Sequence, residues 1–95
     1  MATIMLMHWP GVSKEQYEQV RRDVNWEGEV PEGAKFHVAW FGQDGLHVLD
    51  LWESAEQFQA FSQNRLAAGV QRAGISGQPN VEFAESHAIF APNPI

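Results

Sequence analysis

Two apolar runs around the turn sequence Gly-Gln-Asp-Gly constrain the fold more than any other feature of this chain. The runs, residues 34–41 and 46–52, are rich in Val, Leu, Phe and Trp. An Asp-Gly pair between two such runs is the strongest short-range signal for a β-hairpin. The sequence therefore predicts two neighbouring antiparallel strands in the middle of the chain.

Capping and turn residues place the other elements on either side of this hairpin. Ser13 and Ser54 each stand three residues before a Gln, the pattern of a helix N-terminus, and Gly74 ends the second helix. We expect strands at residues 3–9 and 80–90, a helix at 14–24, a loop at 25–33 and a helix from 55 to about 73. This order predicts one α+β domain, residues 1–95, with the ferredoxin-like βαββαβ arrangement: an antiparallel sheet with two helices on one face.

The strands are apolar on both sides of the expected sheet. In the first strand, Ile4 and Leu6 alternate with Met5 and Met7, so each face receives apolar side chains. The two helices cover one face only, and a second copy of the chain is the simplest cover for the other. The pattern therefore predicts a homodimer.

Polar side chains interrupt the hairpin strands, and pairing the strands sorts them. With either a two-residue or a four-residue loop, His37, Asp50 and Trp52 fall on the same face of the sheet, and His47 falls on the other. His37 then lies opposite either Asp50 or Trp52. A carboxylate next to an imidazole holds it in one tautomer and favours its protonated form.

This grouping makes His37 and Asp50 the candidate catalytic residues, with His37 as a base or a hydrogen-bonding anchor for a ligand and Asp50 as the group that orients it. The expected substrate-binding residues are Trp52, Trp40, His87 and Phe61. His87 and His8 are also expected to approach each other, on the expectation that the first and fourth strands run parallel. The alternative for His37 and Asp50 is a buried pair that merely satisfies two polar groups.

Composition excludes several classes of function. The net charge is −6, so no basic surface is present for nucleic acid or for an anionic membrane. The chain has no cysteine, and no His pair has the short spacing typical of zinc sites, so no metal site is predicted. No phosphate-binding or dinucleotide-binding glycine motif occurs. We expect a soluble cytoplasmic protein without a leader peptide or a tightly bound cofactor.

The segment GLHVLDLWESAEQFQAF, together with the element order, resembles the dimeric α+β barrel superfamily and, within it, the antibiotic-biosynthesis-monooxygenase-like proteins. The resemblance covers nearly the whole chain, and its most specific part is the corner Trp52-Glu53-Ser54 followed by Phe58 and Phe61. It implies a barrel formed by the two sheets of a dimer, and a pocket between sheet and helices in each subunit.

Members of that superfamily include cofactor-free oxygenases, isomerases, cyclases and haem-degrading enzymes. The haem-degrading branch carries its proximal His on a helix, and neither expected helix contains a His. The resemblance therefore implies an enzyme, such as a cofactor-independent monooxygenase, isomerase or cyclase, acting on a small hydrophobic aromatic or carbonyl substrate. The alternatives are a non-catalytic dimer that binds a small ligand and, less favoured, a haem or metal protein that uses strand histidines.

Overall fold

Four strands pair into one antiparallel sheet in the computed structural model, which describes residues 2–93. The strands are β1 (Thr3–Pro10), β2 (Ala34–Gly42), β3 (Gly45–Trp52) and β4 (Asn80–Glu85). Their order across the sheet is β2-β3-β1-β4. This order and the antiparallel pairing confirm the predicted ferredoxin-like topology.

The helices begin and end at the residues that the capping pattern indicated. Helix α1 (Lys14–Val24) starts at Ser13, whose side chain and backbone exchange hydrogen bonds with Gln16. The second helical stretch comprises α2 (Ala55–Phe61), a π-helical turn η1 (Ser62–Leu66) and α3 (Ala67–Arg72). It begins at the cap Ser54 and is followed by Gly74, whose φ of +70° suits glycine.

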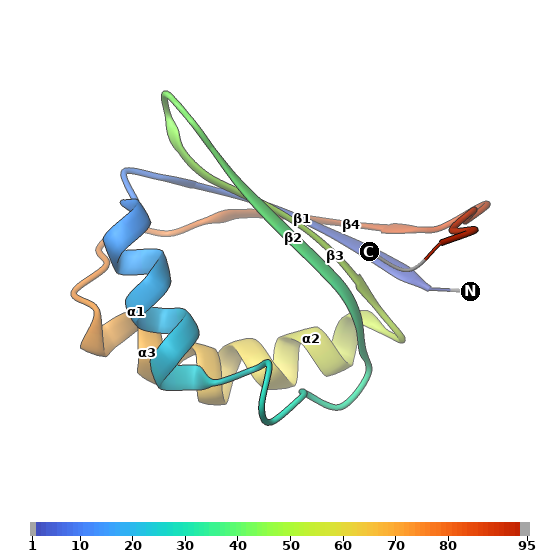
Figure 1. Cartoon of the computed structure of the whole chain (residues 1–95), viewed down its shortest axis with the longest axis horizontal. Coiled ribbons are helices and arrows are strands. Elements are labelled where there is room, and N and C mark those ends of the chain that lie inside the picture. The colour runs from blue at the N-terminus through green and yellow to red at the C-terminus, as the bar shows by residue number, and fades with distance from the viewer. Residues whose placement is uncertain (1, 94–95) are drawn as a thin grey trace.

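Both helical stretches lie on the same side of the sheet, as Figure 1 shows. Within residues 2–93 no helix is long and apolar enough to cross a membrane.

The side of the sheet that the helices cover is the one that carries the alternate residues Met5, Met7 and Trp9 of β1. These side chains, together with Val48 and Trp52 of β3, form the buried core against α2. The opposite face, which we call the outer face, exposes large apolar side chains to between 38% and 46%. They are Leu6, Phe36, Val38 and Trp40. The predicted apolar character of both faces is therefore present in the structure.

The hairpin register sorts the polar residues as the sequence predicted. His37 pairs with Asp50 rather than with Trp52, and Trp40 pairs with His47. The turn consists of Gln43 and Asp44. His37 and Asp50 therefore share the face that the helices cover.

Two expectations about the last strand are wrong. Strand β4 ends at Glu85 and not at residue 90, because its partner β1 begins at Thr3; beyond the paired residues, Ser86 N–H donates to the Ala2 carbonyl. Strands β1 and β4 are antiparallel and not parallel, so His8 pairs with Asn80. His87 follows the other end of β4, and the two histidines lie at opposite ends of this strand pair.

Candidate functional site

A His–Asp pair lies on the covered face of the sheet, where β2 and β3 run side by side. His37 Nδ1 is 2.7 Å from Asp50 Oδ1. Because the two residues are register partners, the backbone alone brings their side chains together. Asp50 is buried, with 6% of its surface exposed, whereas a third of the His37 side chain is accessible.

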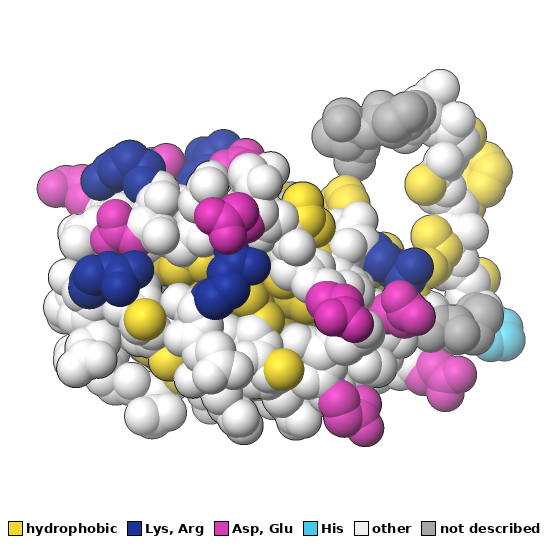
Figure 2. Space-filling model, turned by 90° about the horizontal axis from the view of Figure 1, so that it is seen from below, with side chains coloured by type: hydrophobic (Ala, Val, Ile, Leu, Met, Phe, Trp, Pro, Cys, Tyr) yellow, Lys and Arg dark blue, Asp and Glu magenta, His cyan; other side chains and the backbone are white. Residues whose placement is uncertain are grey.

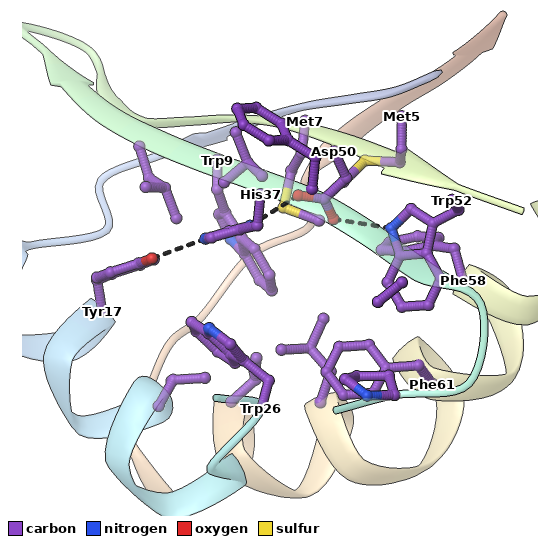
Figure 3. Close-up of a pocket in the computed structure, with 18 of the residues that line it drawn as sticks. Met5, Met7, Trp9, Tyr17, Trp26, His37, Asp50, Trp52, Phe58 and Phe61 are labelled. Atoms are coloured by element: carbon purple, nitrogen blue, oxygen red, sulfur yellow. Dashed lines mark hydrogen bonds and ion pairs between the residues drawn. The ribbon is translucent and has the colours of Figure 1, made fainter. Parts of the chain in front are cut away.

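Tyr17 and Trp52 extend this pair into a continuous hydrogen-bonded array. The Tyr17 hydroxyl of α1 lies 2.8 Å from His37 Nε2. Trp52 donates its indole N–H to Asp50 Oδ2 at 2.9 Å, since residues two apart on a strand point to the same face. Figure 3 shows these four side chains following one wall of a cavity between the sheet and the helices. Each carboxylate oxygen of Asp50 and each ring nitrogen of His37 thus has a partner.

The chemistry of the partners fixes the direction of these hydrogen bonds. An ionised carboxylate only accepts, so Asp50 selects the His37 tautomer that carries its proton on Nδ1. The other nitrogen, Nε2, then has a free lone pair and accepts the Tyr17 O–H. Burial raises the pKa of the Tyr17 hydroxyl to about 12, and attraction by Arg21 opposes this only in part. Tyr17 is therefore a hydrogen-bond donor at neutral pH, and His37 Nε2 is the basic atom of the array.

The cavity beside the array has a volume of about 240 Å³. Its walls are mostly aromatic and aliphatic, with Met5, Met7 and Trp9 from β1 and Phe58 and Phe61 from α2 among the lining residues. Pockets for drug-sized ligands typically measure roughly 300–1,000 Å³, so this cavity suits a small compound. On the helix side, shown in Figure 2, hydrophobic atoms are visible between charged side chains of both signs.

The loop at residues 25–33 forms one wall of the cavity through Trp26. The Trp26 indole lies 5.3 Å from the His37 ring and 5.9 Å from the Tyr17 ring, measured between centroids. Arg65 of η1 holds the loop by donating to the carbonyls of Val24 at 2.9 Å and Glu29 at 2.7 Å.

A second contact to the same loop comes from α1. Arg21 Nε donates to Glu27 Oε1 at 2.7 Å, and this hydrogen bond lowers the pKa of the Glu27 carboxyl. The loop is thus bound to both helical stretches, through Arg21 of α1 and Arg65 of η1. These contacts help to hold Trp26 beside His37.

The residues predicted for substrate binding divide between the two faces of the sheet. Trp52 and Phe61 line the cavity, with their rings 5.7 Å apart. Trp40 lies on the outer face, where it stacks on His47, because alternate residues of β2 point to opposite sides. His87 is exposed beyond the end of β4 and is not among the lining residues. The assignments of Trp40 and His87 to the pocket are therefore wrong in position.

Sequence reasoning missed Tyr17 and Trp26 as members of the site. Tyr17 lies within the helix expected at residues 14–24 and Trp26 within the loop expected at residues 25–33, and neither element was expected to reach the site. One signal was available: Tyr17 is the single tyrosine of the chain, and a hydroxyl on the buried stripe of a helix needs a partner. No comparable signal identifies Trp26, whose position depends on the path of the loop.

Comparisons with known proteins identify the fold. No protein-family model matches the sequence, and no curated protein matches it closely. Solved structures do match. A Nitrosomonas europaea protein of unknown function is 20% identical with a TM-score of 0.62, the alignment covering 98% of this chain and 96% of that one.

Two further structures have described activities. The cofactor-independent oxygenase SnoaB from Streptomyces nogalater is 12% identical, with a TM-score of 0.63 and 97% of each chain covered. The monooxygenase ActVA-Orf6 of Streptomyces coelicolor, solved in complex with nanaomycin D, is 14% identical, with a TM-score of 0.60 and 97% of this chain and 92% of that chain covered. The chain therefore shares its fold with these solved structures, which is the fold that its sequence indicated.

Proposed function

We propose that this protein is a cofactor-independent monooxygenase that acts on a small aromatic substrate bearing a carbonyl or phenol group. The observation that carries the proposal is the array Tyr17–His37–Asp50, which presents a basic nitrogen to an apolar cavity. The described activities of SnoaB and ActVA-Orf6, which share the fold, agree with it. Fold alone does not specify chemistry, which depends on the residues of the site.

The first step is removal of a proton from the substrate by His37. A substrate O–H or acidic C–H that reaches Nε2 replaces the Tyr17 hydroxyl there and gives up its proton. The Asp50 carboxylate, 2.7 Å from Nδ1, stabilises the imidazolium that forms. The displaced Tyr17 hydroxyl becomes a hydrogen-bond donor for the substrate oxygen, where negative charge collects.

Dioxygen is the oxidant in the second step. The substrate carbanion transfers electrons to dioxygen and forms a C–O bond, and the His37 imidazolium returns its proton to the resulting peroxide. Loss of a second C–H proton then breaks the O–O bond, which leaves a carbonyl on the substrate and releases water. One oxygen atom stays in the product, and the substrate itself supplies the electrons. The apolar walls of the cavity limit the access of water, which would otherwise protonate the carbanion.

The outer face supports a homodimer as the working form of the protein. Leu6, Phe36, Val38 and Trp40 leave a contiguous set of apolar side chains on one side of the sheet. Large exposed apolar patches on small proteins mark interaction surfaces. In the proposed dimer these faces pack together, and the helix-side cavities remain separate in the two subunits.

Oxygen consumption with a panel of anthrone-type and quinol-type substrates tests this proposal. We expect His37→Gln, which retains a donor toward Asp50, to lower kcat/KM by roughly 10²–10⁴-fold, the usual contribution of a general base. His87→Gln is the matched control, since His87 is exposed outside the cavity, and it should behave as the unchanged protein.

Three outcomes would contradict parts of the proposal. A folded His37→Gln protein with unchanged turnover removes His37 as the base. Turnover without oxygen uptake, accompanied by exchange of substrate C–H for deuterium, indicates an isomerase or cyclase that shares only the first step. Tight binding of these compounds without any turnover indicates a ligand-binding dimer in which the array only orders the pocket.

A further inference from the structure

A second group of titratable side chains lies on the outer face, at the end of the sheet where the β2–β3 turn projects. His8 of β1 and His47 of β3 are register partners, so their side chains stand next to each other on the same face. Asp44 belongs to the turn that precedes β3. In Figure 1 this turn lies well away from the helices. Leu46 and Val48 line the cavity, so His47 between them, with its partner His8, points to the opposite side of the sheet.

The carboxylate of Asp44 bridges the two imidazoles. Its Oδ2 is 3.0 Å from His8 Nε2, and its Oδ1 is 3.0 Å from His47 Nε2. Candidate ligand atoms of the three residues lie within 4.8 Å of one another. Ligand atoms around a four-coordinate zinc ion, at metal–ligand distances near 2.0–2.2 Å, stand roughly 3–3.5 Å apart. The two oxygen–nitrogen spacings, one to each carboxylate oxygen, are close to this value.

His8 supplies an independent indication of a bound ion at this cluster. Its Nε2 atom is shielded from solvent, and no residue among those described gives it a partner with hydrogen-bond geometry, although Asp44 lies within ion-pair distance. Buried polar atoms without a partner are rare, and a bound ion is one of the few explanations for them. Among the described residues, the group that faces His8 Nε2 is the Asp44 carboxylate, at 3.0 Å.

Ring stacking holds the two imidazoles in place. The His8 and His47 rings stack with centroids 4.5 Å apart, and Trp40 stacks on the other side of His47 at 5.3 Å. Stacking restricts the rotamers of the two histidines before any ligand binds, which lowers the entropic cost of ordering them. Asp44 is the adjustable member, since its side chain is 57% exposed.

We propose that His8, His47 and Asp44 form a binding site for a first-row divalent transition-metal ion, with Zn²⁺ as the simplest probe. Two imidazole nitrogens and one carboxylate favour Zn²⁺, Ni²⁺, Co²⁺ or Fe²⁺ over Mg²⁺ and Ca²⁺, which prefer oxygen ligands. In the single chain, exposure of Asp44 leaves the remaining coordination positions open to water. The ion joins the β2–β3 turn to β1, and its position across the sheet separates it from the chemistry of His37.

Titration of the metal-stripped full chain with Zn²⁺ in a calorimeter tests the site. We expect one ion per chain, no competition from Mg²⁺, and a rise in Tm on binding. With Co²⁺, absorption bands of a low-coordinate ion should appear. Loss of an outer-shell partner alone typically costs roughly 10–100-fold in metal affinity, so His8→Gln, Asp44→Asn and His47→Gln should each cost at least about tenfold.

Two other histidines provide matched controls. His87→Gln removes an exposed His, and His37→Gln removes a His that contacts a carboxylate on the opposite face. Both variants should bind Zn²⁺ as the unchanged chain does. Asp44→Asn is the decisive variant, because an exposed turn residue is replaced without loss of the fold.

The proposal is overturned if the unchanged chain binds no Zn²⁺ or if Asp44→Asn and His47→Gln retain full affinity. It is also overturned if His87→Gln or His37→Gln abolishes binding, which would place the ion elsewhere. Since none of these readouts measures turnover, failure here leaves the proposed oxygenase unaffected.

Discussion

The two faces of the sheet carry His–Asp contacts of similar length in opposite surroundings. On the helix side, His37 and Asp50 lie 2.7 Å apart and Asp50 is buried. On the outer face, Asp44 lies 3.0 Å from both His8 and His47, and more than half of its side chain is exposed. The hydrogen bond from His47 lowers the pKa of the Asp44 carboxyl, whereas on the helix side burial raises the pKa of Tyr17.

This comparison shows that the surroundings, more than the distance, decide what such a contact does. A buried carboxylate without its partners has no water to replace them, so its hydrogen bonds are needed for folding as well as for chemistry. An exposed carboxylate exchanges its partners for water at little cost, so it is free to bind an ion. The buried array suits acid–base chemistry on an apolar ligand, and the exposed cluster suits a metal ion.

The largest effect is expected from a charge placed on the apolar part of the outer face. Trp40→Glu should dissociate the proposed homodimer, because the interface would have to bury an unpaired carboxylate. We expect a loss of at least about 2 kcal/mol in dimerisation free energy, the level of an interface hot spot. Sedimentation velocity over a range of concentrations measures it.

A matched control for Trp40→Glu is Gln63→Glu, which places the same charge on an exposed position of the helix side and should leave the dimer intact. If Trp40→Glu sediments as the unchanged chain does, the outer face is not the interface. If the unchanged chain is monomeric at micromolar concentration, no such dimer exists.

A smaller effect, on the free energy of unfolding, is expected when one Asp on each face of the sheet is replaced by Asn. Asp50→Asn replaces one acceptor oxygen by an N–H₂ group. The single remaining oxygen of the Asn side chain cannot take the place of both carboxylate oxygens, one of which contacts His37 and the other Trp52. One buried donor loses its partner, so the free energy of unfolding should fall by about 1–3 kcal/mol. Asp44→Asn is exposed and should change it by less than about 0.5 kcal/mol.

Urea unfolding of the two Asp→Asn variants in metal-free buffer measures this difference. Equal losses of stability would show that burial does not separate the two carboxylates. An Asp50→Asn variant that loses no stability would show that the buried array is held by its surroundings and not by its hydrogen bonds.

Local signals made most of the fold predictable. Apolar alternation, the Asp-Gly turn and the caps Ser13 and Ser54 each act over a few residues, and these gave the element order and the helix on residues 14–24. The shared face of His37, Asp50 and Trp52 was predictable because a hairpin register depends only on the loop between the strands. The two possible loops left Asp50 and Trp52 both open as the residue opposite His37, and the structure selects Asp50. The predictions that failed concern relations set by the whole sheet, such as the direction of β4 relative to β1 and the expected approach of His87 to His8.

The remaining parts of both sites depend on contacts between distant segments. Alternation along the hairpin strands puts Trp40 and Trp52 on opposite faces, but it does not say which face the helices cover, so the sequence alone could not exclude Trp40 from the pocket. Tyr17 reaches His37 from α1, and His8 meets His47 from β1. Spacing rules for metal ligands search along one segment, so they do not detect a pair formed across two strands.

The smallest effect is a shift in the titration of the Tyr17 hydroxyl, which reports how far water reaches the helix side of the sheet. The folded chain should show a phenol titration near pH 12, against about 10 in the denatured chain. Because the folded pKa is the higher one, stability from this group is present below pH 10 and is lost as the pH rises toward 12. Tyr17 is the single tyrosine, so the ultraviolet absorbance of tyrosinate reports on it alone. Circular dichroism at each pH verifies that the chain is still folded, and the same titration in denaturant gives the reference. A midpoint near 10 in the folded chain would mean that water reaches the Tyr17 hydroxyl freely and that the cavity wall beside His37 is not dry.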